Sequence, residues 1–215
     1  MNNTKKLIEN IKVLCHSSIV INAEKFIYID PFRIKQNYEN ADIILITHDH
    51  YDHYSEEDIQ KVKKEDTIIV IPEDLLENVR KLGFIKDNII AVKPNEKYTV
   101  ENIAIETILA YNINKNFHPK ENNWLGYILT IENIKYYIAG DTDITDENKE
   151  VKCDVALVPI GGTYTMDYKE AAELINFIKP KFAIPTHYGE IVEKKEDAIE
   201  FVKLINPDID SAILI

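Results

Sequence analysis

Cysteine is scarce in this sequence. Only Cys15 and Cys153 are present, far apart and outside any C-x-x-C arrangement. A disulfide framework and a zinc site made of thiolates are therefore excluded, because both need several cysteines at close spacing. The two side chains instead fit the role of small buried apolar groups.

Long apolar runs are also missing, and so are low-complexity linkers. No stretch approaches the roughly 20 apolar residues of a transmembrane helix, and Met1 to Glu9 lack the apolar segment of a signal peptide. We therefore expect a cytoplasmic protein without a membrane partner. Because no proline-, glycine- or serine-rich stretch divides the 215 residues, we predict a single domain over residues 1–215.

Positive charge is in deficit. The 25 lysines and arginines face 37 aspartates and glutamates, which gives a formal charge of −12 and a sequence pI near 5.0. Such a balance opposes long-range attraction to phosphate backbones or anionic lipid. Nucleic acid is therefore not expected as a partner, and we expect a small-molecule substrate instead.

Short apolar runs separated by turn residues predict strands. They lie at residues 18–21, 26–29, 43–46, 68–71, 89–92, 98–100, 103–109, 127–131, 135–139, 155–158, 182–185 and 212–215. Helices are predicted after Ser55, which resembles an N-cap with Asp58 three residues on, and over residues 72–82, 167–179 and 196–205. Hairpins and β-α-β units thus occur twice along the chain. This pattern predicts two sheets packed face to face with helices outside, in the α/β or α+β class.

The densest cluster of ionisable groups is the hexapeptide His48-Asp49-His50-Tyr51-Asp52-His53, directly behind the apolar run Ile43–Ile46. It holds half of the six histidines. Burying so many ionisable groups without a strongly charged partner would be costly, and a bound cation is the simplest such partner. His48 and His50 can point the same way, so the loop could offer ligands to two adjacent metals. The alternative is a polar, solvated loop.

Further ligands would have to come from distant parts of the sequence, and three candidates lie at strand ends or in loops. Asp141 follows Gly140 at the end of an apolar strand, where glycine lets the backbone approach a metal. His187 follows the strand at residues 182–185, and His118 lies in a loop without a regular pattern. Each has a plainer interpretation: an ordinary turn for Asp141, a structural histidine for His187, and a surface histidine for His118.

His16 and Asp30 flank the first predicted hairpin. They could line the same cleft as outer partners, since metal-bound histidines usually donate their second nitrogen to a carboxylate or carbonyl. Both could equally be turn or capping residues.

Taken in order, the histidine-rich loop, His118, Gly140-Asp141 and His187 resemble the metallo-β-lactamase fold superfamily. Several local strings are similar to its branch of predicted metal-dependent hydrolases related to ascorbate-phosphate lactonase. The strings are Cys15-His16-Ser17-Ser18, Ile29-Asp30-Pro31-Phe32, Ala139-Gly140-Asp141-Thr142-Asp143, Pro159-Ile160-Gly161-Gly162 with Thr165-Met166-Asp167, and Ile184-Pro185-Thr186-His187-Tyr188-Gly189. Many members of that branch have a glycine before the first histidine, where this chain has Cys15.

The resemblance implies an α+β fold, an αββα four-layer sandwich of two mixed sheets packed face to face with outer helices. It implies that His48, His50 and His118 hold one metal, that Asp52, His53 and His187 hold the other, and that Asp141 bridges them. Two divalent ions are expected, with zinc first and manganese, nickel or iron as alternatives. Relatives often assemble, so a homo-oligomer is compatible with the resemblance.

The expected function is metal-dependent hydrolysis of an ester, lactone or phosphodiester bond in a small substrate. Two cations would lower the pKa of a shared water toward roughly 7. Asp52 and Asp141 would be the catalytic carboxylates, while Tyr188, Tyr164 or Lys115 could stabilise developing negative charge. Three alternatives stay open: iron-dependent thiol or redox chemistry on the same fold, a nuclease, and a binding or sensing protein that has lost catalysis.

Overall fold

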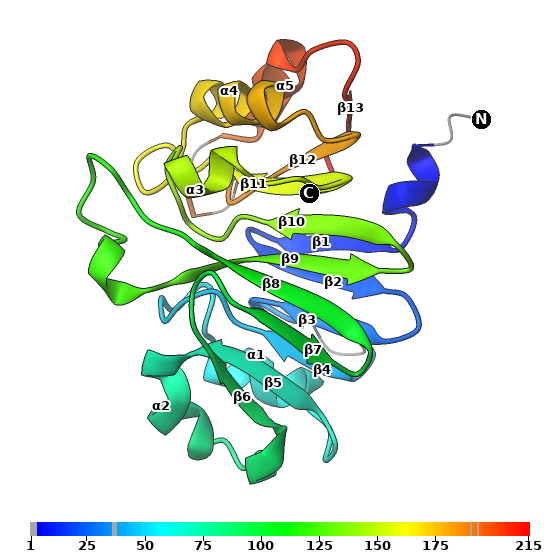
Figure 1. The fold of residues 1–215 in the computed structure, drawn as a ribbon, viewed down its shortest axis with the longest axis vertical. Coiled ribbons are helices and arrows are strands. Elements are labelled where there is room, and N and C mark those ends of the chain that lie inside the picture. The colour runs from blue at the N-terminus through cyan, green and yellow to red at the C-terminus, as the bar shows by residue number, and fades with distance from the viewer. Residues whose placement is uncertain (1–3, 36–37, 190, 193) are drawn as a thin grey trace. The chain divides into compact units, whose positions relative to one another are not determined.

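A computed structural model describes residues 4–35, 38–189, 191–192 and 194–215. The chain divides into two compact units, which can be followed by colour in Figure 1. Residues 10–93 form the N-terminal unit, and residues 94–215 with the segment that ends at Glu9 form the C-terminal unit. The expectation of a single domain over residues 1–215 stays a prediction. No helix in the described residues has the length and apolar character needed to cross a bilayer.

The N-terminal unit is built on a six-stranded mixed sheet in the order β1-β2-β3-β4-β5-β6. Its strands are β1 (Ile11–Cys15), β2 (Ser18–Asn22), β3 (Phe26–Ile29), β4 (Ile43–Leu45), β5 (Ile68–Pro72) and β6 (Ile89–Val92). β1, β2 and β3 are antiparallel neighbours, whereas β3 to β6 run parallel. The connections between the parallel strands contain α1 (Glu56–Val62), α2 (Leu76–Arg80) and the short 3-10 turns η2 (Glu73–Leu75) and η3 (Lys86–Asn88).

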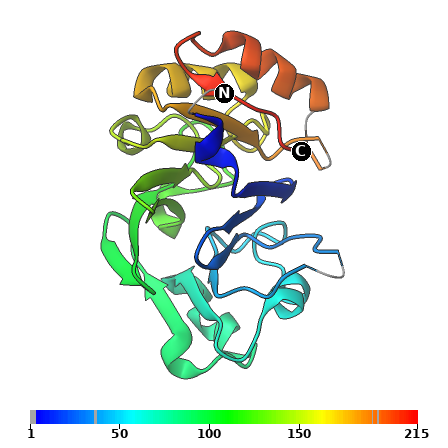
Figure 2. The ribbon, with the colours of Figure 1, turned by 90° about the vertical axis from the view of Figure 1, so that its right-hand side faces the viewer.

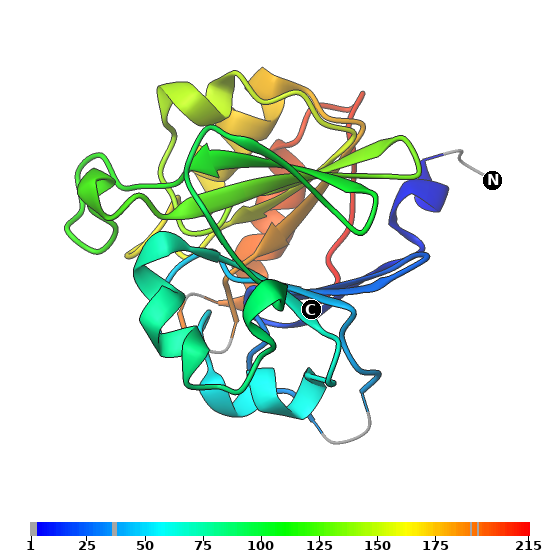
Figure 3. The same ribbon diagram turned by 60° about the horizontal axis from the view of Figure 1, so that its bottom comes forward.

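Helices α1 and α2 pack on the same face of this sheet (Figure 3). Ile59 of α1 is fully buried in one apolar cluster with Ile44 of β4 and Ile69 of β5. Ile43 and Leu45, which point to the opposite face of β4, are fully buried as well. Burial on both faces explains why β4 appears in the sequence as a continuous apolar run.

The C-terminal unit is built on a seven-stranded mixed sheet in the order β13-β12-β11-β10-β9-β8-β7. Its strands are β7 (Lys97–Val100), β8 (Ile103–Leu109), β9 (Leu125–Ile131), β10 (Ile134–Ile138), β11 (Val155–Pro159), β12 (Phe182–Thr186) and β13 (Asp210–Ser211). β7 to β10 are antiparallel neighbours, and β10 to β13 run parallel. The unit also contains α3 (Asp146–Lys149), α4 (Tyr168–Ile178), α5 (Lys195–Leu204) and the 3-10 turns η1 (Lys5–Ile8) and η4 (Lys120–Asn122).

Helices α4 and α5 lie next to each other and cover one face of the parallel strands (Figure 2). α4 begins at Asp167, whose carboxylate accepts the backbone N–H of Glu170 while the Glu170 carboxylate accepts that of Asp167. This capping box satisfies N–H groups that the first helical turn leaves without a helical acceptor. The buried Ile175 of α4 then joins Phe201 of α5 and Val158 of β11 in one apolar cluster.

The predicted strands are confirmed to within two residues with one exception, and both sheets are mixed, in agreement with the predicted α+β class. The strand predicted at residues 212–215 is wrong, because pairing with β12 ends at Ser211 and Ile213 is 40% exposed. An apolar pattern indicates burial rather than pairing. The helix predicted at residues 72–82 is shorter, since Pro72 still belongs to β5 and α2 ends at Arg80. The sequence pattern predicts neither the edge strand β1 nor the one-turn helix α3.

Candidate metal centre

The histidine loop, residues 47–54, follows β4 in the N-terminal unit and ends where Ser55 caps α1. The Ser55 side chain accepts the backbone N–H of Asp58 at 3.2 Å, which confirms the predicted N-cap. A tight turn brings the backbone N–H of His53 within 2.9 Å of the His50 carbonyl. His48, Asp52 and His53 are buried while Asp49 is exposed, so these ligand candidates and Asp49 point different ways.

Asp30 organises this loop from the end of β3. Its carboxylate accepts the Thr47 backbone N–H at 2.8 Å, the Thr47 hydroxyl at 2.6 Å and the Nδ1–H of His53 at 2.7 Å. Burial raises the pKa of Asp30, and the interaction with His53 and these hydrogen bonds oppose this shift without outweighing it. When the Asp30 carboxyl is ionised it only accepts, which places the His53 proton on Nδ1 and leaves the lone pair on Nε2.

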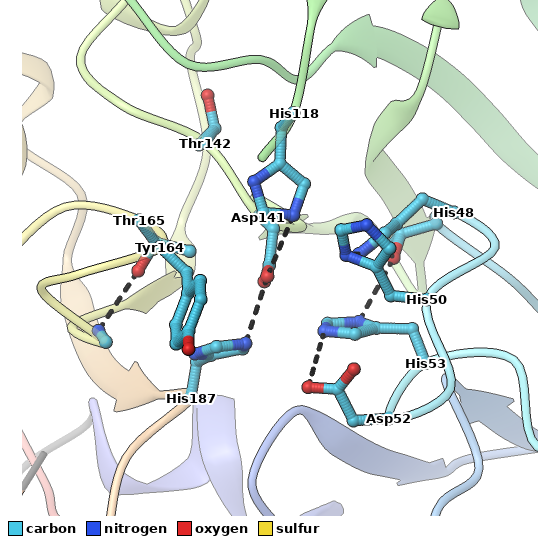
Figure 4. A network of polar contacts seen from close by, with 12 residues as sticks. His48, His50, Asp52, His53, His118, Asp141, Thr142, Tyr164, Thr165 and His187 are labelled. Carbon is cyan, nitrogen blue, oxygen red and sulfur yellow. Dashed lines mark hydrogen bonds and ion pairs between the residues drawn. The ribbon is translucent and has the colours of Figure 1, made fainter. Parts of the chain in front are cut away.

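The same reasoning assigns the tautomer of His48. The single hydroxyl proton of Thr47 is donated to Asp30, so Thr47 Oγ1 accepts the Nδ1–H of His48 at 2.9 Å. His48 Nε2 therefore also carries a lone pair, and it lies 3.1 Å from Nδ1 of His50. The rings of His48 and His53 lie 4.0 Å apart between centroids (Figure 4). A divalent cation binds a neutral histidine through a ring nitrogen that carries a lone pair, and Nε2 of both histidines is in this state.

His16 supplies the partner of Asp52. It lies in the turn between β1 and β2 with a φ of 55°, its side chain is fully buried, and its Nε2 lies 3.0 Å from Asp52 Oδ2. The same carboxylate oxygen lies 3.9 Å from His53 Nε2. His16 and Asp30, which the sequence left open as outer partners or turn residues, thus both contact candidate ligands.

The C-terminal unit brings together His118, Asp141 and His187, which come from three different loops. Asp141 follows β10 after Gly140, His187 follows β12, and His118 lies between β8 and β9. Asp141 Oδ2 lies 3.3 Å from His118 Nε2 and 3.0 Å from His187 Nε2 (Figure 4). All three side chains are buried. The surface-loop and ordinary-turn interpretations therefore fail for His118 and Asp141.

Asn112 assigns the tautomer of His118. Its Nδ2 donates to the Tyr164 carbonyl at 3.0 Å, and its Oδ1 accepts the His118 backbone N–H at 3.0 Å, so the orientation of the amide is unambiguous. Oδ1 therefore also accepts the Nδ1–H of His118, at 3.1 Å. The Nε2 lone pair of His118 then faces the Asp141 carboxylate, and two acceptors this close repel unless a proton or cation lies between them.

Gly161 makes room for His187. A Cβ atom at this position would lie 2.3 Å from His187 Nδ1 and 2.9 Å from the His187 carbonyl oxygen. Neither Asn112 nor Gly161 was identified as a site residue from the sequence, although Gly161 lies in one of the strings that carried the resemblance. Asn112 has no local signal, because its partners are set by the contact between two loops.

The three residues predicted to stabilise negative charge lie in the C-terminal unit. Lys115 binds the Asp143 carboxylate at 2.5 Å and donates to the Thr165 carbonyl at 2.7 Å, so its ammonium braces two loops. Burial raises the pKa of Tyr188 to about 12, which keeps its hydroxyl protonated. Tyr164 is 37% exposed.

The donor chemistry of both sets fits divalent cations. Imidazole and carboxylate groups suit zinc, manganese, nickel and iron, and each unit gathers both kinds of donor with ring nitrogens in the ligating tautomer. A thiolate ligand is not indicated by Cys153, because burial raises its pKa to about 12 and keeps the thiol protonated.

Comparisons with known proteins agree with this donor set. A family model described as the beta-lactamase superfamily domain matches residues 10–187. The UPF0173 metal-dependent hydrolase of Thermococcus onnurineus is 31% identical over 220 residues, which cover 95% of each chain. The crystal structure of a proposed metal-dependent hydrolase from Parabacteroides distasonis is 33% identical with a TM-score of 0.81, covering 94% of this chain and 91% of that one.

A third similar protein supports the fold alone. The proposed zinc-dependent hydrolase of the metallo-β-lactamase superfamily from Thermotoga maritima is 23% identical, with a TM-score of 0.63 over 94% of this chain and 96% of that one. Together these matches confirm the resemblance and the fold class predicted from the sequence. The chain belongs to the metallo-β-lactamase superfamily, and it is a metal-dependent hydrolase.

Proposed function

We propose that this hydrolase works with two divalent cations, zinc in the first instance, and cleaves an ester, lactone or phosphodiester bond in a small substrate. One observation carries the proposal: Nδ1 of His48, His53 and His118 donates to oxygens of Thr47, Asp30 and Asn112, respectively, so that each Nε2 keeps a lone pair beside buried carboxylates. Hydrogen bonding of Nδ1 to an oxygen acceptor is the usual arrangement of metal-bound histidines.

The proposed assignment of ligands follows the family resemblance and the donor chemistry of each set. His48, His50 and His118 would hold one cation, Asp52, His53 and His187 would hold the other, and Asp141 would complete the ligand set. Such cations supply hydroxide near neutral pH and polarise the bond under attack. Asp52 orients the nucleophilic water and returns a proton to the leaving group, and the contact from His16 Nε2 holds its carboxylate in place.

The substrate class to test first is a lactone, because the sequence resembles the branch related to ascorbate-phosphate lactonase. A screen of lactones, simple esters, thioesters and phosphodiesters with zinc, manganese or nickel covers the proposed bond types. The metal content of the purified protein is measured in parallel. An excess of iron over zinc together with thiol oxidation would favour the iron-dependent alternative.

Two substitutions test the proposed centre, one in each unit. His48→Ala and Asp141→Ala each remove a buried donor, and we expect loss of bound metal and at least about a thousandfold loss of kcat/KM. Asp49→Ala is the matched control, because Asp49 lies in the same loop as His48 but is exposed. This variant should keep its bound metal and its kcat/KM. Wild-type protein without a stoichiometric cation, measured by plasma mass spectrometry after purification, would refute the proposal.

The remaining proposals concern surroundings and partners. We propose a cytoplasmic protein with a small-molecule substrate, no membrane partner and no nucleic-acid partner, and the formal charge of −12 supports the last point. Cell fractionation tests the first, and an RNA shift assay at low salt tests the last. A homo-oligomer is tested by light scattering after gel filtration.

A further inference from the structure

Two loops of the C-terminal unit expose apolar side chains beside the candidate ligands. Loop 112–118, between β8 and β9, exposes Ile113 (54%) and Phe117 (42%), and loop 161–166, between β11 and α4, exposes Tyr164 (37%). The rings of Phe117 and Tyr164 meet edge to face, with centroids 4.6 Å apart and planes at 70°. We call Phe117 and Tyr164 the aromatic pair.

The aromatic pair is held on a rigid support. Asn112 Nδ2 donates to the Tyr164 carbonyl, and Lys115 Nζ donates to the Thr165 carbonyl at 2.7 Å, so the two loops are bonded to each other twice. The Asp143 carboxylate also holds loop 112–118 in place, because it accepts the Ile113 backbone N–H at 2.9 Å and binds the Lys115 ammonium. The exposed rings are therefore fixed in position rather than left on a mobile segment.

Both loops also contact the ligand candidates of this unit. Phe117 immediately precedes His118, and Gly161 at the start of the other loop packs against the His187 ring. Figure 4 shows Tyr164 together with His118, Asp141 and His187. The two residues of the aromatic pair thus belong to loops that carry or contact candidate ligands.

Exposed aromatic rings on a braced surface favour an apolar ligand over a charged one. Aromatic side chains that folding leaves outside, on loops that cannot move to cover them, are typical of binding sites. Loop 112–118 has one lysine, Lys115, and Asp143 with the Thr165 carbonyl already engages its ammonium. Among the described residues of loops 112–118 and 161–166, no other side chain is cationic, so these loops offer apolar ring surface without an ammonium group free to bind a phosphate or carboxylate.

We propose that the aromatic pair is a subsite for an uncharged apolar group, such as a phenyl ring, on the substrate that is hydrolysed next to it. The inference deepens the proposed function and rests on it for the reaction, but the binding of an apolar group by the pair can be measured without catalysis. Edge-to-face contact of a third ring with Phe117 and Tyr164 would supply the selectivity.

The kinetic test uses three esters with alkyl leaving groups. Ethyl acetate has no ring, 2-phenylethyl acetate carries one on the alcohol side, and ethyl phenylacetate carries one on the acyl side. We expect wild-type kcat/KM for at least one ring-bearing ester to exceed that for ethyl acetate by about tenfold. Phe117→Ala should remove most of this preference and leave ethyl acetate within about twofold, and Tyr164→Ala should remove most of the preference as well. Phe177→Ala, an exposed phenylalanine on α4, should keep the preference.

The binding test separates this inference from the proposed hydrolysis. In metal-free protein, 2-phenylethanol should shift backbone amide resonances of residues 112–118 and 161–166, and ethanol should not. Phe117→Ala should lose these shifts, and Phe177→Ala should retain them. Shifts that are absent or lie elsewhere would overturn the inference even in an active enzyme. An inactive wild type that shows the expected shifts would refute the hydrolysis and leave the apolar subsite standing.

Discussion

The two units share one order of antiparallel and parallel strands, and they differ in where their candidate metal ligands lie. Each has antiparallel strands followed by parallel strands with helices in the connections. In the N-terminal unit the candidate ligands lie in a single loop after β4, whereas in the C-terminal unit they follow β8, β10 and β12. The same scaffold therefore supports a local donor set and a dispersed one.

The likeness of the scaffolds extends to single side chains. Asp42 precedes β4, accepts the backbone N–H of Phe26 at the start of β3 and binds Lys64 at 2.6 Å. Asp154 precedes β11, accepts the backbone N–H of Lys135 in β10 and binds Lys181 at 2.8 Å. Each carboxylate thus fastens the central parallel strand to its neighbour in the same way.

The supporting acceptors differ in charge between the two units. Asp30, a carboxylate, holds the Nδ1–H of His53, while Asn112, a neutral amide, holds that of His118. Hydrogen bonds to a charged acceptor are stronger than those to a neutral one. Metal affinity should therefore depend more on Asp30 in the N-terminal unit than on Asn112 in the C-terminal unit.

The largest effect is expected from Asp30→Asn. An amide has one acceptor oxygen where the carboxylate has two, so it cannot accept from the Thr47 backbone N–H and also from the Thr47 hydroxyl and His53 Nδ1. The tautomers of His48 and His53 are then no longer held. We expect zinc affinity to fall by about 100-fold, at the upper end of what loss of such a partner costs. Competition with a fluorescent chelator measures it, with exposed Asp49→Asn as the control. Unchanged affinity would remove Asp30 from the support of the loop.

A smaller effect, about tenfold in zinc affinity, is expected from Asn112→Leu. The conservative Asn112→Asp keeps an oxygen that accepts from His118 Nδ1, and it should recover most of the lost affinity. Nitrogen chemical shifts of the His118 ring report the tautomer directly and should change only in the leucine variant. If the Asn112→Leu variant and the wild type had the same His118 ring tautomer, Asn112 would not support His118 as Asp30 is proposed to support His53.

The smallest effect concerns the shared scaffold. Burial opposes ionisation of Asp42 and Asp154, but hydrogen bonds from a lysine and a backbone N–H outweigh it and hold the pKa of each carboxyl below its usual range. We expect Asp42→Asn and Asp154→Asn each to lower the free energy of unfolding by about 1 kcal/mol at pH 7. Urea unfolding curves measure these differences.

The pH dependence has a defined sign. A carboxyl with a lowered folded-state pKa stabilises the protein above its unfolded-state pKa, and this contribution disappears as the pH falls through the folded-state value. The difference between wild type and either variant should therefore shrink below about pH 4. Asp66→Asn, an exposed carboxylate 3.6 Å from Lys64, should change little at any pH. If only one of the two variants had a lower free energy of unfolding, Asp42 and Asp154 would not be equivalent.

Much of the fold and the denser half of the site could be predicted from local sequence. Continuous apolar runs mark β4 and β11 because their side chains are buried on both faces. Ser55 and Asp167 mark helix starts because they bond to N–H groups three residues on. The error at residues 212–215 arose because apolar character does not specify which backbone groups pair.

The sequence by itself determined the histidine loop, because its donors are neighbours in the chain and a tight turn between β4 and α1 is enough to gather them. Only the tertiary structure decided that Asp141 lies between His118 and His187, that His16 holds Asp52, and which tautomers Asp30 and Asn112 impose. The physical reason is that these hydrogen bonds join residues brought together by strand order and register, and no spacing along the chain encodes them.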